Sequence, residues 1–471
     1  MPDRKTYEQP YQRRKTAQQV KRKPAKTKQV GWVWFWLGLT GVAIVSATAG
    51  AILAVSLAST PLLQKKLSPE EEAVFGKGDG FSRSNMQLPE VTRPVNILVM
   101  GIKVISSDID NPPPETKNLG YKALVNSFEG LADTILLLRF NPETKKITVL
   151  SIPRDTRIAM QKYGVMKINA ANVDGGPALS AKAVSQLVQD VKIDRYIRVN
   201  VQGVQKLVDA LGGVTVYVPK DIKYRDESQH LYIDLKQGKQ HLDGDRTLQL
   251  LRFRYDKDGD IGRIQRQQMV MRALMEQALN PLTVTRMPKI MSTIQSHIDT
   301  NLSVEELLAL VSFSVGIDRS NVQMLMLPGG SNGDGHHGVS YWLPNRRRIQ
   351  VMLGQYFDQE YSPTETVDPA RMRVAIQDST GDTKAVSALV KTLQKAGYRN
   401  VFIDAPLPEP LGVTRIVAQQ GDRDSAKGIS QSLGFGEVRV ETSGTLFSDV
   451  TIQVGQDWLQ NQVVSDSNIN H

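Results

Sequence analysis

Short apolar runs alternate with amphipathic stretches through the middle of this 471-residue chain. Three runs have the length and composition of buried strands, and they lie at residues 95–102, 133–140 and 146–152. Two stretches place apolar side chains at helical spacing, at residues 178–190 and 201–211, and strand-like runs at 195–200 and 214–219 bracket the second. The alternation predicts an α/β fold, a layered α/β/α domain around a central mixed sheet over residues 94–365.

A smaller unit follows this domain. Residues 371–403 have the order strand, glycine turn, helix, strand, and residues 413–440 repeat that order. The proline-containing stretch 361–373 marks the boundary between the two regions. The pattern predicts a smaller α/β C-terminal domain of two β-α-β halves over residues 370–460, followed by a tail at 461–471.

The N-terminal region contains a long uncharged stretch. Residues 30–60 carry no charge and are predominantly apolar, whereas a bilayer span needs only about 20 such residues. We expect one transmembrane helix there, followed by a polar linker at 61–93. A cleaved signal peptide is the alternative, because Ala47 and Ala49 resemble a cleavage site, but the basic and apolar regions are longer than is usual for such peptides.

Most of the positive charge lies before that helix. Residues 1–29 contain ten Lys or Arg residues against Asp3 and Glu8, so this tail carries +8 of the total +10. The positive-inside bias places the tail in the cytoplasm and the domains outside the cytoplasmic membrane, to which the chain is anchored by a single pass. The remainder of the chain, at +2, is nearly neutral, which argues against nucleic acid as a partner. The chain has no cysteine and therefore no disulfide.

A group of arginines stands out in residues 252–268. Arg252, Arg254, Arg263 and Arg266 fall within fifteen residues, and the neighbouring acids are too few to neutralise them. On a strand, Arg252 and Arg254 would share one face. On a helix that starts near Gly262 with Asp260 as its N-cap, Arg263, Arg266 and Gln267 would share another. Guanidinium groups bind phosphate oxygens bidentately, which suggests an external anion, although such runs are more often solvated ion-pair surfaces.

The ordered motifs resemble the LytR-CpsA-Psr family. They are "ADTILLLRFNPETKKITVLSIPRDTRI", "KINAANVDGG", "VNVQGVQKLVDALGGVTVYVP" and "GKQHLDGDRTLQLLRFRYDKDGDIGRIQRQQ". The unit after Arg371 resembles the LytR C-terminal domain through "VAIQDSTG" and "LQKAGY". The resemblance implies a membrane-anchored phosphotransferase outside the cytoplasm. Its expected partners are a glycopolymer on a polyprenyl-pyrophosphate carrier and a peptidoglycan acceptor.

The resemblance also implies a site. By this resemblance, Arg154 in "SIPRDTR" is a principal phosphate-binding arginine in addition to the group at 252–266. It follows the end of a strand, where α/β sheets hold ligands. The residues expected to bind the pyrophosphate are Arg154, Arg252, Arg254, Arg263, Arg266, Gln267, Lys103, Lys167 and Asn169. Arg154 and Arg263 are also expected to act in catalysis, and Asp133 or Asp155 to accept the proton of the acceptor hydroxyl. Apolar walls from residues 133–140 and 178–190 are expected to hold the prenyl tail, although the same residues would serve an ordinary core.

Two positions depart from the family pattern. Lys103 stands where the family usually has Asp, and Leu131 where it usually has Arg. In the family, the missing acid and the residue matching Asp133 help hold a divalent cation. In this chain, either Asp133 alone recruits Mg²⁺ together with the phosphates, or the Lys103 ammonium takes the place of the cation. The second option is our preferred hypothesis. The departures keep two other functions open, a lipid-pyrophosphate binder or pyrophosphatase without transfer, and an envelope-linked transcriptional regulator.

Overall fold

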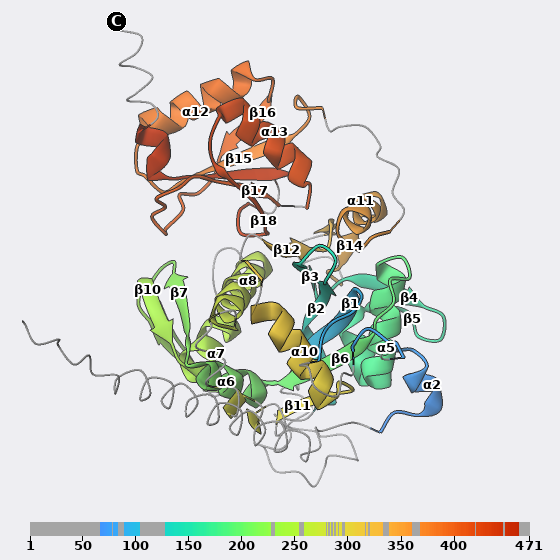
Figure 1. Cartoon of the computed structure of the whole chain (residues 1–471). Helices are drawn as coiled ribbons and strands as arrows, with labels where there is room; N and C mark the ends of the chain where they lie inside the picture. The colour runs from blue at the N-terminus through green and yellow to red at the C-terminus, as the bar shows by residue number, and fades with distance from the viewer. Residues whose placement is uncertain are drawn as a thin grey trace, which may run out of the picture. The chain divides into compact units, whose positions relative to one another are not determined.

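A computed structural model describes most of the chain after residue 65 (Figure 1). The described residues are 66–77, 79–82, 89–103, 128–227, 231–253, 259–278, 280, 283, 286, 289–290, 292–293, 297–315, 317–318, 321–332, 339–359, 368–419, 421–445 and 448–460. The predicted basic tail, membrane helix and C-terminal tail lie outside these ranges. Among the described residues, none of the helices has the length and apolar character needed to span a bilayer.

The first domain is built on a six-stranded sheet with the order β11-β6-β1-β2-β3-β12. Its strands are β1 (Val95–Lys103), β2 (Leu131–Asn141), β3 (Lys146–Ile152), β6 (Arg195–Asn200), β11 (Ile298–Thr300) and β12 (Val322–Met326). β1 runs parallel to β6 and antiparallel to β2, while β3 runs parallel to β12. The three apolar runs near the start of the domain are therefore strands, and the central sheet is mixed as the sequence predicts.

Helices cover both faces of this sheet (Figure 1). On one face, Leu98 and Met100 of β1 belong to the same buried core as Val184 of α5 (Ala171–Leu187). On the other face, Phe140 of β2 packs edge-on against Phe313 of α10 (Val304–Val315), with ring centroids 6.1 Å apart. The same alternation that makes these runs strands thus sends successive side chains into two different cores.

The other helices among the described residues of this domain are α2 (Pro69–Glu72), α6 (Val201–Leu211), α7 (Gly244–Arg252), α8 (Gly259–Ala278) and α11 (Arg346–Tyr356). The Asn200 side chain caps the N-terminus of α6 by accepting from the Gly203 amide. Gly212 ends α6 at a φ of 90°, a conformation that other residues rarely adopt. The predicted helix at 201–211 therefore has both of its ends fixed by its own sequence.

Four strands form a satellite beside the central sheet. β7 (Val214–Val218) pairs with β10 (Gly238–Leu242), and β8 (Ile222–Asp226) pairs with β9 (Leu231–Leu235), in each case antiparallel. Val214, Val216, Ile233 and Leu250 are buried together there, in a core separate from the main one. The run at 214–219 is a strand as predicted, but it pairs with β10 outside the central sheet.

Further short pairs complete the domain, namely β4 (Arg157–Met160) with β5 (Gly164–Lys167), and β13 (Gly329–Ser331) with β14 (Trp342–Pro344). A 3-10 turn, η1 (Ile168–Ala170), leads from β5 into α5.

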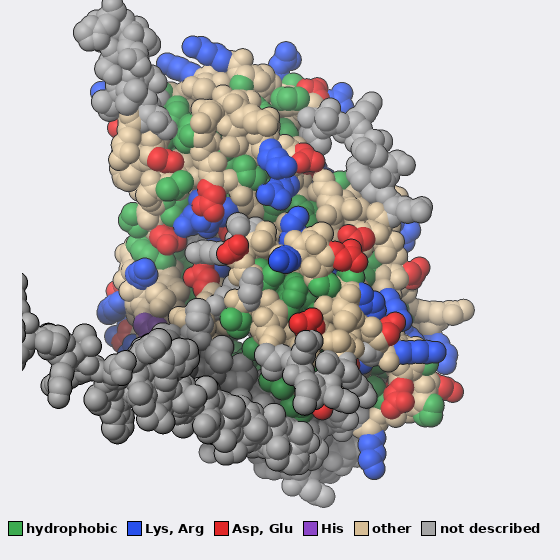
Figure 2. Space-filling view, in the orientation of Figure 1, with side chains coloured by type: hydrophobic (Ala, Val, Ile, Leu, Met, Phe, Trp, Pro, Cys, Tyr) green, Lys and Arg blue, Asp and Glu red, His purple; other side chains and the backbone are tan. Residues whose placement is uncertain are grey.

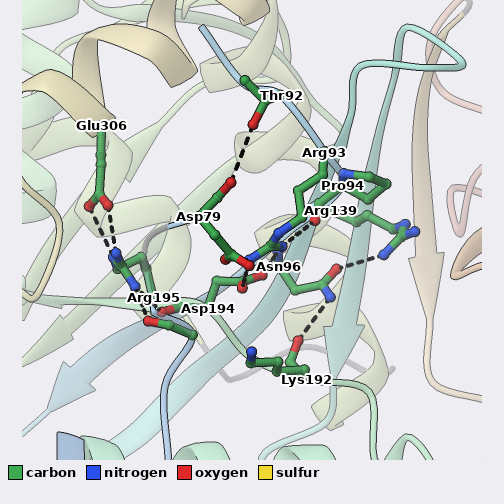
Figure 3. Close-up of polar contacts among 11 residues, drawn as sticks. Asp79, Thr92, Arg93, Pro94, Asn96, Arg139, Lys192, Asp194, Arg195 and Glu306 are labelled. Carbon is green, nitrogen blue, oxygen red and sulfur yellow. Dashed lines mark hydrogen bonds and ion pairs between the residues drawn. The ribbon is translucent and has the colours of Figure 1, made fainter. Parts of the chain in front are cut away.

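A polar network fixes the segment that enters β1 (Figure 3). Arg93 donates to the Asp194 carboxylate at 2.8 Å, and the other oxygen of Asp194 accepts from the Asn96 amide at 2.8 Å. Phe75 packs against Tyr196 with ring centroids 5.3 Å apart and is buried. Phe75 and Arg93, which belong to the predicted linker at 61–93, thus pack against the first domain.

The C-terminal domain has a five-stranded sheet with the order β16-β15-β19-β17-β18. Its elements are β15 (Arg373–Asp378), α12 (Thr383–Lys395), β16 (Asn400–Ile403), β17 (Arg415–Ala418), α13 (Arg423–Leu433), β18 (Glu437–Val440) and β19 (Val450–Val454). β15 with β16, and β17 with β18, are parallel neighbours joined by a helix, which matches the two predicted β-α-β halves. β19 lies between the halves, parallel to β15 and antiparallel to β17.

On the face shown in Figure 2, basic and acidic side chains of the described residues are interspersed, and no large patch carries charge of one sign. This agrees with the near-neutral charge calculated for the chain after residue 29.

Candidate active site

The site is centred on Arg154, in the turn that follows β3. The Thr156 amide donates to the Pro153 carbonyl at 3.0 Å, and the Thr156 hydroxyl donates to the same oxygen at 2.5 Å. This tight turn places Arg154 and Asp155 at its outer positions, just beyond the carboxyl end of a central strand. That edge of an α/β sheet is where ligands are usually bound.

Asp133 reaches the same edge from the neighbouring strand. Ile135 of β2 pairs with Ile152 of β3, so Asp133 and Arg154 are each two residues beyond a paired position. The register of β1 with β2 shifts between Gly101 and Ile102, which leaves Asp133 as an extra residue in a β-bulge. Bulges re-aim side chains at strand ends. The bulge therefore explains how an acid inside an apolar strand comes to face Arg154.

Alternating charges link four side chains at this edge. Arg154 Nη1 lies 2.9 Å from Asp133 Oδ1, and Arg154 Nε lies 3.4 Å from Asp155 Oδ2. Lys167 Nζ lies 2.8 Å from Asp155 Oδ1. Two carboxylates therefore orient the Arg154 guanidinium. The side chain is also 21% exposed, so part of it remains accessible to solvent. This arrangement suits an arginine that receives an anionic ligand.

Lys167 and Asn169 belong to the segment that returns toward this turn. The Asn169 amide donates to the Arg154 carbonyl at 3.2 Å, and Asn169 itself is buried. The Lys167 ammonium also lies 5.9 Å from the centre of the Tyr341 ring. The structure therefore brings Lys167, Asn169 and Asp155, three of the residues predicted for the site, to Arg154. Asn169 does so through its main chain.

The arginines after residue 250 are arranged differently from the sequence prediction. Leu251 and Arg252 are the last two residues of α7, so the stretch "LRFR" does not begin the predicted strand. Arg252 is half-buried. α8 begins at Gly259, before the expected start near Gly262, so Asp260 lies inside the helix and is not its N-cap. These corrections remove the shared strand face of Arg252 and Arg254.

Arg266 has an inward role. It is 5% exposed, and its Nη2 donates to the Phe253 carbonyl at 2.7 Å while its guanidinium lies 5.2 Å from the centre of the Phe253 ring. Arg266 thus holds the end of α7 against α8. Gln267, the next residue of α8, is half-buried.

Three predicted site residues cannot be placed. Arg254 lies outside the described residues, and the side chains of Arg263 in α8 and Lys103 in β1 also lie outside them. The backbone of Lys103 pairs with Leu131 on β2, so the two positions that depart from the family pattern are direct neighbours. The meeting of Arg154 with Arg252, Arg254 and Arg263 stays a prediction.

A buried ion pair behind this edge was missed by the sequence reasoning. Arg198 Nε donates to Asp299 Oδ2 at 2.6 Å, and both residues are almost fully buried. Arg198 Nη1 also donates to the Phe128 carbonyl at 3.1 Å, and the Asn172 amide group donates to the Gly130 carbonyl at 2.7 Å. These bonds fix the main chain just before β2. An arginine inside the apolar run "RYIRVN" was the available signal.

Tyr196 adjoins the same pair. Burial raises the pKa of the Tyr196 phenol well above its ordinary value of 10.0, and the negative charge of Asp299 raises it further. The phenol therefore stays protonated at neutral pH.

The described carboxylates at this edge are paired with basic side chains. Asp133 is engaged by Arg154, and Asp155 is engaged by Arg154 and Lys167. Across the described ranges, the structure has no cluster of three or more His, Cys, Asp or Glu side chains placed to hold a metal. Mg²⁺ is normally held by one or two carboxylates together with substrate phosphates and water, so a Mg²⁺ site at Asp133 and the Lys103 alternative both stay predictions.

Family models and known proteins match large parts of this chain. The model described as the LytR_cpsA_psr family matches residues 63–357, and the model described as LytR cell envelope-related transcriptional attenuator matches residues 371–458. The polyisoprenyl-teichoic acid–peptidoglycan teichoic acid transferase TagV of Bacillus subtilis is 28% identical over 64% of this chain and 74% of its own length. TagU of Oceanobacillus iheyensis, with the same enzyme name, is 32% identical over 54% of this chain and 72% of its own.

Among solved structures, the crystal structure of B. subtilis TagV is 27% identical and covers 57% of this chain and 99% of its own, with a TM-score of 0.46. The family models together account for most of the chain after residue 62. This chain belongs to the LytR-CpsA-Psr family and carries a LytR C-terminal domain.

Proposed function

We propose that this protein transfers a glycopolymer from a polyprenyl-pyrophosphate carrier to peptidoglycan or a similar envelope acceptor. The acceptor hydroxyl attacks the phosphorus next to the glycan, the bond from that phosphorus to the bridging oxygen breaks, and polyprenyl phosphate leaves. The observation that carries the proposal is Arg154, oriented by Asp133 and Asp155 at the carboxyl end of β3. The names of the relatives TagV and TagU, both teichoic acid transferases, support it.

Electrostatic stabilisation is the main contribution of the arginines. In the transfer step, negative charge moves onto the oxygens of the transferring phosphoryl group and of the leaving phosphate. Arg154, Arg252, Arg254 and Arg263 bind these oxygens, and Arg266 with Gln267 orients the segment that carries them. Arg266 suits the orienting role because it is buried and bonds the Phe253 carbonyl. Removing one such donor in an enclosed site typically lowers the rate by roughly 10²–10³-fold.

The proton of the acceptor hydroxyl goes to Asp133 or Asp155. Both carboxylates lie at the sheet edge beside Arg154, where a hydroxyl that attacks the phosphorus has to approach. Replacement of each by Asn keeps the shape and removes the base. The variant that loses turnover while it still binds the donor identifies the base.

Phosphate charge near Lys103 is neutralised by that ammonium, in place of a divalent cation. The position of Lys103 at the end of β1, beside the start of β2, favours this role, and the engaged carboxylates of Asp133 and Asp155 leave few oxygen ligands. Chelator is expected to leave transfer largely intact, whereas Lys103→Ala abolishes it. Complete loss of transfer in chelator, restored by Mg²⁺, would contradict this assignment.

The predicted helix within residues 30–60 anchors the protein in the cytoplasmic membrane, with residues 1–29 inside and both domains outside. The support is the uncharged stretch and the ten basic residues that precede it. Protease added to intact spheroplasts should digest the two domains and spare a tag fused at residue 1.

The decisive experiment combines the detergent-solubilised full chain with a lipid-pyrophosphate-linked glycan and a peptidoglycan acceptor. Joined product supports transfer, phosphate release without joining supports the pyrophosphatase alternative, and neither product supports a binder or regulator. Arg154→Ala should abolish joining. Arg157→Ala is the matched control, because Arg157 lies three residues further along on an exposed strand position.

A further inference from the structure

A cavity lies between the β8–β9 hairpin and α7. Its volume is about 560 Å³. Small-molecule sites typically enclose about 300–1,000 Å³, so this space is large enough for one or more sugar rings. None of the residues predicted for the pyrophosphate site lines it.

The cavity offers flat surfaces for a ring. Tyr232 is 48% exposed, and the Arg225 guanidinium lies 5.3 Å from the centre of its ring. The Tyr232 hydroxyl donates to Glu227 at 2.6 Å, which fixes the plane of the ring. An exposed aromatic ring with a stacked guanidinium is suited to the apolar face of a sugar, because both present a rigid plane with polar groups at the edge.

Polar side chains of fixed orientation line the opposite wall. Arg246 and Gln249 are three residues apart on α7 and so face the same side. The Gln249 amide group donates to Asp245 at 2.7 Å and accepts from the Asp234 main-chain amide at 3.4 Å. The bond from Asp234 joins the hairpin to the helix, and the bond to Asp245 lies within α7 and orients the Gln249 side chain. The cavity is therefore a built feature with hydrogen-bonding groups already oriented.

The charge of the lining favours an anion. Lys223, Arg225 and Arg246 line the cavity, and Asp234 is the carboxylate among the lining residues. Arg225 forms an ion pair with Glu227, and Lys223 and Arg246 are exposed residues of the lining. A ligand that combines sugar rings with carboxylate or phosphate groups would satisfy both the flat surfaces and the charge.

One wall of the cavity packs against the end of α7, next to Arg252. Tyr224 lines the cavity and packs edge-on against Phe253, with ring centroids 6.0 Å apart. Phe253 in turn is held by Arg266 and directly follows Arg252. This contact is buried, since Phe253 is 6% exposed, and it fixes the cavity wall against the segment that carries Arg252.

We propose that the cavity between the β8–β9 hairpin and α7 is a subsite for an acidic saccharide chain. The assignment rests on the proposed function and specifies its substrate class. The chain is either the donor glycopolymer or the acceptor glycan, since both can carry anionic groups on sugar rings. Tyr232 stacks on a sugar ring, and Arg246 with Lys223 binds its acidic substituents.

Equilibrium binding of the full chain to soluble oligosaccharides tests the subsite without catalysis. Oligogalacturonate is the acidic probe, maltooligosaccharide of matched length the neutral one, and polyglutamate the acidic polymer without sugar rings. Tyr232→Ala and Arg246→Gln should each weaken oligogalacturonate binding by roughly tenfold. Lys236→Gln is the matched control, because Lys236 lies on the same hairpin, is 73% exposed and does not line the cavity.

The outcomes separate the possibilities. Preference for oligogalacturonate over both other probes, lost in the two cavity variants and kept in Lys236→Gln, supports the subsite. Equal binding of polyglutamate, or unchanged oligogalacturonate binding by both variants, overturns it. Both variants change exposed side chains, and an unaltered thermal unfolding transition confirms that they fold.

A transfer assay then identifies the source of the glycan. A KM raised in the cavity variants for the lipid-linked donor alone identifies the donor glycan, and one raised for peptidoglycan alone identifies the acceptor. Unchanged KM values for both substrates overturn the subsite while the transferase proposal stands. Absence of transfer by the unmodified chain, together with selective oligogalacturonate binding, would instead refute only the transferase proposal.

Discussion

The pair Arg198–Asp299 provides the sharpest prediction for stability. Their side chains are 2% and 5% exposed, and both Nε and Nη2 of Arg198 lie 2.6 Å from Asp299 Oδ2. Asp299→Asn keeps the shape of the side chain and leaves the Arg198 charge buried without its counter-charge. Losing one partner of a buried pair costs about 3–5 kcal/mol. Because the Phe128 carbonyl and the Asn172 side chain still accept from Arg198, we expect the lower end, about 3 kcal/mol.

Calorimetry of the detergent-solubilised full chain measures this loss. In a domain of this size, 1 kcal/mol corresponds to roughly 2–4 °C in the midpoint, so the transition of the first domain should fall by about 10 °C. The double variant Arg198→Met/Asp299→Leu should recover most of the loss, because replacing both charges with apolar groups of similar volume is often neutral. A midpoint for Asp299→Asn within about 2 °C of the unmodified chain would refute the reasoning.

Three other predictions concern the two domains. Lys167→Met should lower the rate of transfer by roughly tenfold, because Asp155 loses an ion-pair partner. The midpoint of unfolding should change little, because the Lys167 side chain is 32% exposed. Kinetics and calorimetry on one preparation check both expectations. Arg266→Met should lower stability by about 2 kcal/mol and raise the KM for the lipid-linked donor, whereas an unchanged KM would show that Arg266 does not position the site. The pKa of Asp449 reflects burial, which raises it, and a larger opposing effect of bonds and charge from Arg373, so the net shift is below its ordinary value of 3.8. The ionised Asp449 therefore stabilises the fold fully above pH 3.8, and this stabilisation is lost as the pH falls through the lower pKa of the folded state. Urea unfolding measures the difference in free energy of unfolding between the unmodified chain and Asp449→Asn. This difference should be constant near neutral pH and should disappear in acid.

The central strands could be predicted because their apolar runs have few other outcomes. β2 has an uninterrupted apolar run at 135–138, four of the seven residues of β3 are apolar, and Pro142 in the intervening turn bounds both strands. β7 differs in that Val214, Val216 and Val218 are buried while Thr215 is exposed. This alternation is typical of a strand with one solvated face, and it could have indicated that β7 leaves the central sheet.

The stretch "LRFR" was misassigned because period two and helical spacing both fit four residues. The stronger signal lay upstream, where the Asp243 side chain accepts from the Arg246 amide and starts α7. Asp243 with Thr247 and Leu250 at buried positions indicates a helix through Arg252. Local alternation therefore gave the wrong element where the cap would have given the right one.

Long-range polar partners were beyond any local pattern. Arg198 and Asp299 are 101 residues apart, and no spacing rule connects them. Arg154 could be proposed as a site residue from its place after a strand. Its contact with Asp133 depends on a β-bulge that no local sequence pattern predicts. The sequence thus indicated which residues take part more readily than how they are held.

The central position of β19 determines when the C-terminal domain can be completed. β15 and β17 are not neighbours, and the strand that joins them is made after every other strand of that sheet. The two halves therefore stay unjoined during synthesis until residue 454 is available. A chain shortened before Val450 would keep both β-α-β halves and lose the strand between them, leaving two sheet edges open to pairing with other chains.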